Sequence, residues 1–265
     1  MTTNKNSRFD KWAYLDKDVL LRIFMILNVV DLIRGACVCT SWQEAASEPS
    51  LWKMVDLSKL EARNFNRQPE SQHLVLVSGR TPNLKRLVLP VRNNDISVNE
   101  FEEAAKNWPN LESLTIPCSF PVKFMKAIGK HCKNLYELKI MRRFDTDCAE
   151  TILAYAPNLK VLSLRCNMVH REAMLRLLKE MKHLQVLNIS HCLILDHSPN
   201  PGFMSVLSKL DKVILEEASR LEKFIFCKND SCHICQLQIS TNGILFWSRY
   251  DEGIWLTDEV CTLAH

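Results

Sequence analysis

One segment near the middle of the chain reads Pro157-Asn158-Leu159-Lys160-Val161-Leu162-Ser163-Leu164. Its pattern is a helix-ending pair followed by Leu-x-x-Leu-x-Leu or Ile, and five copies of it occur in the sequence. The first leucines of the copies lie at positions 84, 111, 135, 159 and 184, so successive copies are 27, 24, 24 and 25 residues apart. A pattern that returns at such an interval predicts one structural unit repeated along the chain.

This unit is typical of a leucine-rich repeat. In Leu-x-Leu the two leucines point to one side of a short strand, and the residue between them points to the other side. A segment with helical spacing of apolar residues follows each strand, and stacked units of this kind bury one continuous core. The sequence therefore predicts an α/β fold, a short leucine-rich-repeat solenoid with a curved parallel sheet and outer helices.

The limits of the repeat region follow from weaker copies. A sixth copy, Leu221-x-x-Phe224-x-Phe226, begins 37 residues after the fifth, which indicates an insertion near 194–202. A further strand is predicted at 54–57. Within the repeats, Ser97 with Glu100 forms a capping-box pattern and Asp145 is predicted to cap another helix. We expect about six to seven repeats over residues 54–245, followed by a C-terminal cap or tail over 246–265.

A block of different character, residues 10–53, precedes the repeats. Its apolar residues follow a helical period and predict three short helices. We expect Asp16 to cap the first helix and Asp31 to cap a second helix over 32–38. The third is expected to start near Ser41 and to end before Pro49.

This block resembles an F-box. The matching positions are Leu15, Val19-Leu20, Ile23-Phe24, Leu27, Asp31-Leu32, Val38-Cys39, Trp42 and Leu51-Trp52. Asp16 stands where the family usually has proline, in a pair that contacts the adaptor, so the departure bears on adaptor affinity. The resemblance implies that the block docks on a Skp-family adaptor through Leu15, Val19, Leu20, Ile23, Phe24, Leu27, Leu32, Val38 and Trp42. The alternative is that the helices only cap the open end of the first repeat.

The block and the repeats together resemble the F-box/leucine-rich-repeat family, and the tail around Trp247, Tyr250, Gly253 and Trp255 resembles its small plant members. The resemblance implies the substrate-recognition subunit of an SCF-type cullin–RING E3 ubiquitin ligase, with an unknown protein target bound by the repeats. The alternative is a repeat scaffold for an acidic partner without ligase function. Residues 58–93 and 120–145 each carry a net charge of +5, which favours an acidic partner or a solvated helical face.

Catalysis is not expected from this sequence. It contains no Gly-x-Ser-x-Gly, no phosphate-binding loop and no Gly-x-Gly-x-x-Gly, and its six glycines are not clustered. No cofactor is expected. The aromatic residues form no series that would stack on bases, so nucleic acid is not an expected partner.

The sequence also indicates a compartment. No apolar stretch approaches the roughly 18 residues of a membrane helix, and residues 1–10 are polar, so neither a membrane nor a signal peptide is expected. Eleven cysteines are scattered without a disulfide framework. This usage is typical of a reducing compartment, so we expect the nucleus, the cytoplasm or both.

Three of these cysteines form half of a zinc pattern. Cys227 is followed by Cys232-His233-Ile234-Cys235, and Cys-x-x-Cys is a zinc-ligand spacing. His233 or Cys261 is a candidate for a fourth ligand, but no second pair of ligands follows in the sequence. From the sequence alone we expect no metal, with Cys227, Cys232 and Cys235 as weak candidates.

The target is expected on the concave face of the strands, the usual binding surface of such solenoids. The residues between the buried leucines point to this face, and the residues assigned to the target are Arg86, Lys139, Arg165 and Asn188. Lys139 and Arg165, on neighbouring strands, are expected to hold a carboxylate or phosphate. The alternative is that targets bind the insertion at 194–202 or the tail at 246–257.

Overall fold

The structure is a computed structural model that describes residues 12, 14–57, 70–89, 96–116, 122–141, 143–197, 204–207, 209–227, 232, 235–236 and 259–263. The tail at 246–257 and His233 lie outside these residues. No helix within them is long and apolar enough to span a membrane.

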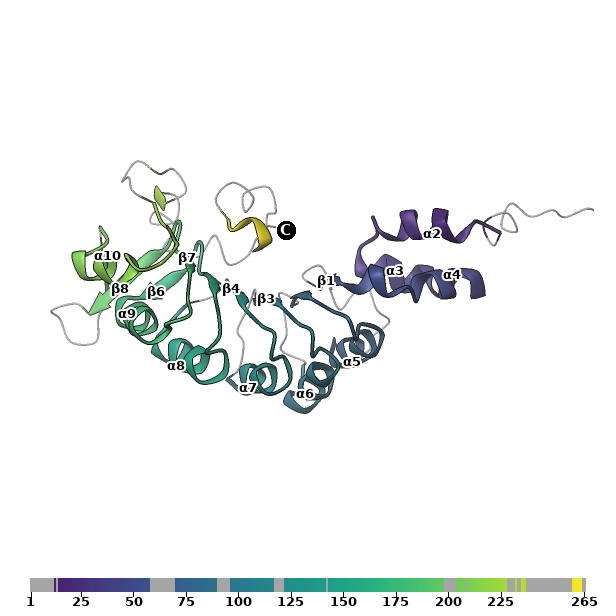
Figure 1. The fold of residues 1–265 in the computed structure, drawn as a ribbon, viewed down its shortest axis with the longest axis horizontal. Helices are drawn as coiled ribbons and strands as arrows, with labels where there is room; N and C mark the ends of the chain where they lie inside the picture. Colours follow the sequence, from purple (N-terminus) through teal and green to yellow (C-terminus); the bar gives the residue numbers. More distant parts are fainter. Residues whose placement is uncertain are drawn as a thin grey trace, which may run out of the picture.

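The repeats build one parallel sheet in which each new strand is added beside the previous repeat (Figure 1). Its strand order is β1 (Met54–Asp56), β2 (Arg86–Val88), β3 (Ser113–Ile116), β4 (Glu137–Ile140), β5 (Val161–Ser163), β7 (Val186–Asn188) and β10 (Lys223–Ile225). The strands lie along the inner side of the arc and the helices along its outer side. This confirms the predicted solenoid, including the strand at 54–57 and the sixth copy.

The register explains why the leucine pattern specifies this sheet. The central apolar residue of each strand pairs with that of the next strand, in the series Val55, Leu87, Leu114, Leu138, Leu162, Leu187 and Phe224. The leucines of this series are fully buried. Because strand side chains alternate, a slip of one residue would turn the whole series away from the core.

The outer helices are α5 (Glu70–Arg80), α6 (Val98–Lys106), α7 (Val122–His131), α8 (Thr146–Tyr155), α9 (Arg171–Glu180) and α10 (Lys212–Ala218). The two predicted caps are confirmed. Ser97 Oγ accepts from Glu100 N at 3.2 Å, and Asp145 Oδ1 accepts from Cys148 N at 3.0 Å. Each bond satisfies one of the amide groups that a helix start leaves without a partner.

Helices α7 and α8 pack closely at Gly129. A Cβ atom at this position would lie 2.3 Å from the carbonyl oxygen of Tyr155. Backbone atoms cannot move aside as a flexible side chain can, so only glycine fits here.

A tight turn follows the strand in the fourth and fifth repeats. Cys166 and His191 occupy equivalent positions in it, with φ of 57° and 58°. Asn167 supports the turn, because its Nδ2 donates to Ile140 O at 3.1 Å and its Oδ1 accepts from Met168 N at 2.9 Å. The chain then enters a second, three-stranded sheet of β6 (Met168–His170), β8 (Leu193–His197) and β9 (Met204–Val206). Strands β8 and β9 are antiparallel; β8 contains residues 194–197 of the predicted insertion, and β9 begins after its predicted end at 202.

The amino-terminal block contains α2 (Lys17–Phe24), α3 (Val29–Gly35), α4 (Thr40–Ala46) and the short η1 (Pro49–Trp52). Asp16 caps α2, as predicted, by accepting from Asp18 N at 2.8 Å. The predicted start of the second helix is wrong. Asn28 caps it by accepting from Asp31 N at 3.0 Å, so Asp31 lies in its first turn.

Candidate functional site

The nine residues assigned to adaptor binding divide into two groups. Leu20, Phe24 and Leu32 are buried in the core of the block, where Phe24 packs edge-on against Trp42 at a centroid distance of 5.5 Å. Val19 and Val38 are exposed, and Leu15, Ile23, Leu27 and Trp42 are partly buried. In this structure the buried three support the surface of the block rather than form it.

Sequence reasoning missed several exposed apolar side chains of this block. Tyr14 is 86%, Ile26 84% and Met25 65% exposed. Met25 and Ile26 follow α2 directly. The sequence did indicate exposed apolar side chains here, because the apolar residues from Val19 to Leu27 are too many for one buried face of a helix of this length.

The concave face differs from the prediction. Lys139, Arg165 and Asn188 were expected to be open to solvent, but they are 1%, 1% and 0% exposed. Residues 259–263, which include the short η4 (Cys261–Leu263), lie against the strands here. Arg86, at the other end of the sheet, is only partly buried, and its Nη2 lies 3.8 Å from Glu137 Oε2.

The Glu259 carboxylate lies over three adjacent strands. Its Oε1 accepts from Ser163 Oγ at 2.7 Å, from Asn188 Nδ2 at 2.9 Å and from its neighbour Val260 N at 2.8 Å. Its Oε2 lies 3.2 Å from Lys139 Nζ, which also donates to Leu263 O at 3.1 Å. Burial lowers the pKa of Lys139, and the charge of Glu259 opposes this shift. Lys139 therefore contacts a carboxylate, but one that belongs to the chain itself.

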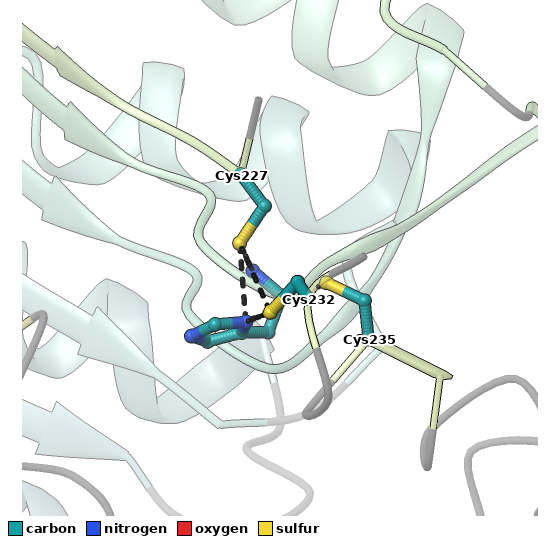
Figure 2. A group of neighbouring side chains, drawn as sticks. Cys227, Cys232 and Cys235 are labelled. Carbon is teal, nitrogen blue, oxygen red and sulfur yellow. Dashed lines mark hydrogen bonds between the residues drawn. The ribbon is translucent and has the colours of Figure 1, made fainter. Parts of the chain in front are cut away.

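The three candidate cysteines come together near the end of β10. Figure 2 shows the side chains of Cys227, Cys232 and Cys235 gathered in one place. Their sulfur atoms surround Nδ1 of His191 at 3.1, 3.3 and 3.5 Å. Cys261, a fourth ligand considered from the sequence, is exposed and not part of this group. His191 was missed because it precedes Cys227 by 36 residues, in the preceding repeat.

Comparisons with known proteins agree with this architecture. Residues 13–58 match the family model for F-box-like domains. The chain is 34% identical over 303 aligned positions to F-box/LRR-repeat protein At3g48880 of Arabidopsis thaliana, covering 98% of each chain. It is 27% identical to putative F-box protein At4g11580, covering 94% of this chain and 95% of that protein. It is 25% identical to putative F-box/LRR-repeat protein 9, covering 71% of this chain and 91% of that protein; both relatives are also from Arabidopsis thaliana.

The helical block, the repeat sheet and the similarity along nearly the whole chain agree with one another. Proteins of this kind are, in general, non-catalytic substrate receptors of SCF-type ubiquitin ligases. The chain belongs to the F-box/LRR-repeat family.

Proposed function

We propose that this chain is the substrate-recognition subunit of an SCF-type cullin–RING ubiquitin ligase. Its amino-terminal helices would bind a Skp-family adaptor, and its repeats would bind a target protein. Such a subunit makes and breaks no bonds. It raises the effective concentration of the target beside the ubiquitin carrier, as a linker does between two binding modules.

The observation that supports adaptor binding most strongly is the apolar surface of the block. Six of the thirteen exposed large apolar side chains in the described part of the chain lie between Trp12 and Val38. A concentration of this kind is typical of a protein-interaction surface. A block that only capped the first repeat would present a polar outer face, so the exposed apolar residues favour the adaptor.

Adaptor binding can be tested with single charged substitutions. Ile26→Asp and Val38→Asp should each weaken binding to a recombinant Skp-family adaptor by about tenfold or more, since an exposed apolar side chain contributes roughly 1.5–3 kcal/mol when it is buried. Val213→Asp is the matched control, because Val213 is 41% exposed on α10, in the repeat region. Titration calorimetry measures the three affinities.

Unchanged affinity of both block variants would refute the assigned surface. A wild-type chain that captures a partner but no adaptor would favour the repeat scaffold without ligase function.

We assign the target to the part of the concave face that residues 259–263 leave accessible. Arg86 is the one of the four assigned residues that remains partly exposed. Arg86→Glu should weaken target capture in cells with the ligase blocked and spare adaptor binding. If Arg86→Glu has no effect while trimming residues 194–202 abolishes capture, the target binds the insertion instead.

A further inference from the structure

We infer that His191, Cys227, Cys232 and Cys235 form a structural zinc site that fastens the end of the repeat array. Their four ligand atoms all lie within 4.8 Å of one another. Zinc bonds of about 2.3 Å to sulfur and 2.0 Å to nitrogen place tetrahedral ligand atoms about 3.5–3.8 Å apart. The nitrogen–sulfur separations here are 3.1, 3.3 and 3.5 Å, and 4.0 Å separates the sulfurs of Cys227 and Cys232.

Hydrogen bonds to the imidazole do not account for three sulfurs at one nitrogen, although Cys227 Sγ also donates to Cys232 Sγ at 4.0 Å and accepts from the His191 amide at 3.3 Å. A neutral imidazole nitrogen carries either one hydrogen or one lone pair, so His191 Nδ1 can satisfy only one of the three sulfurs. A disulfide does not account for it either, because all three cysteines are free thiols, and the sulfurs of Cys227 and Cys232 are 4.0 Å apart rather than about 2.05 Å. A cation at the centre of the group contacts all four atoms at once.

The donor set selects the metal. Three thiolates and one imidazole are soft or borderline ligands, and this combination in a tetrahedral arrangement is typical of zinc. Calcium and magnesium require oxygen ligands, which this group lacks. Four protein ligands leave no position open for water or substrate, so the site is structural rather than catalytic.

The repeat itself positions the imidazole. His191 has a φ of 58°, and Cys166, at the equivalent position one repeat earlier, has nearly the same φ of 57°. The turn is therefore a regular feature of the repeat, and in the fifth repeat it places His191 in the site. The amide of His191 also lies 3.3 Å from Cys227 Sγ, and a backbone donor to a ligand sulfur is a common second contact in metal sites.

The location gives the site its structural role. Cys227 follows β10, the last strand of the sheet within the described residues, while His191 belongs to the fifth repeat. The ligands therefore join the edge of the sheet to its neighbour across the insertion. A solenoid requires a cap at each end, and an open sheet edge promotes association with other chains. Zinc would supply part of the cap at this end.

Metal content and a spectroscopic probe test this inference on the full chain, purified under reducing conditions. Elemental analysis should find one zinc per chain. Replacement of zinc by cobalt(II) should give the visible absorption of tetrahedral cobalt and the charge-transfer bands of cobalt–thiolate bonds. A chelator should lower the melting temperature, because the binding free energy of a structural metal contributes to folding.

Variants test the ligand set. Cys232→Ser, Cys235→Ser and His191→Ala should each lower zinc content to a small fraction of one per chain, whereas Cys261→Ser, outside the group, should retain it. If a ligand variant does not fold, the metal content and the cobalt spectrum of the wild-type chain still decide whether the zinc site exists. A wild-type chain with far less than one zinc and no cobalt–thiolate bands would overturn the inference. So would a Cys232–Cys235 disulfide found by alkylation and mass spectrometry, or zinc lost only from Cys261→Ser.

Discussion

Glu259→Ala should release residues 259–263 from the concave face. The substitution removes the carboxylate that contacts Lys139, Ser163 and Asn188. Lys139 would then be a buried ammonium that has lost the carboxylate of Glu259, in a side chain that is 1% exposed. Water can reach this ammonium only if the segment above it moves away.

Two free energies decide whether residues 259–263 stay docked over the buried charge of Lys139 or are released. Removing one partner of a buried ion pair costs about 3–5 kcal/mol, because the other charge stays desolvated. Keeping Leu263 buried returns only about 1.5–3 kcal/mol. Release of residues 259–263 is therefore favoured. The loss in the free energy of unfolding should then be smaller than the cost, about 3–5 kcal/mol, of a charge that stays buried.

Lysine footprinting measures this release directly. An amine-acetylating reagent should leave Lys139 unmodified in the wild-type chain and modify it in Glu259→Ala. Lys85, whose side chain is 55% exposed, should react equally in both chains and serves as the internal control. Glu259→Gln combined with Lys139→Met removes both charges and should keep the segment docked, with slow hydrogen exchange over 259–263.

Two outcomes would refute the reasoning. If Lys139 reacts in the wild-type chain, the segment does not cover it. If Lys139 stays unreactive in Glu259→Ala while urea unfolding shows unchanged stability, the ion pair does not hold the segment.

Three further substitutions, with Gly79→Ala as a control, test the packing and the hydrogen bonds of the repeats. Gly129→Ala should lower the free energy of unfolding, since its Cβ would meet Tyr155 O at 2.3 Å. Gly79→Ala, with nothing within 4 Å of its Cβ, should be neutral or stabilising by up to about 1 kcal/mol. Urea unfolding compares the two variants. Asn167→Ala should cost about 1–3 kcal/mol, since it leaves Ile140 O and Met168 N without the side-chain partner; an equal melting temperature would contradict this. Ser97→Ala should cost about 1 kcal/mol through loss of the α6 cap, measured as a shift in the urea midpoint.

The features that the sequence predicted correctly are local or periodic. The strand register follows from the leucine spacing, and the Ser97, Asp145 and Asp16 caps follow from residues two or three positions away. The predicted start of α3 was wrong. Asn28 and Asp31 are both residue types that cap helices well, and only the fold of the preceding turn selects Asn28.

The features that the sequence did not predict depend on distant contacts. Lys139 was expected to be exposed because nothing near it indicates that Glu259 returns to cover it. His191 lies 36 to 44 residues before the three cysteines, and only the stacking of the repeats brings the four side chains together.

The docked segment also changes how the array is expected to unfold. In a simple solenoid each unit contacts only its neighbours, so units can fray one at a time from an end. Residues 259–263 instead contact β4, β5 and β7 together, across sequence separations of 71 to 124 residues. Loss of any one of these strands breaks a contact shared with the others, so the middle of the array should melt as one cooperative unit. The same long separations raise the contact order, and this part of the chain should complete its folding late.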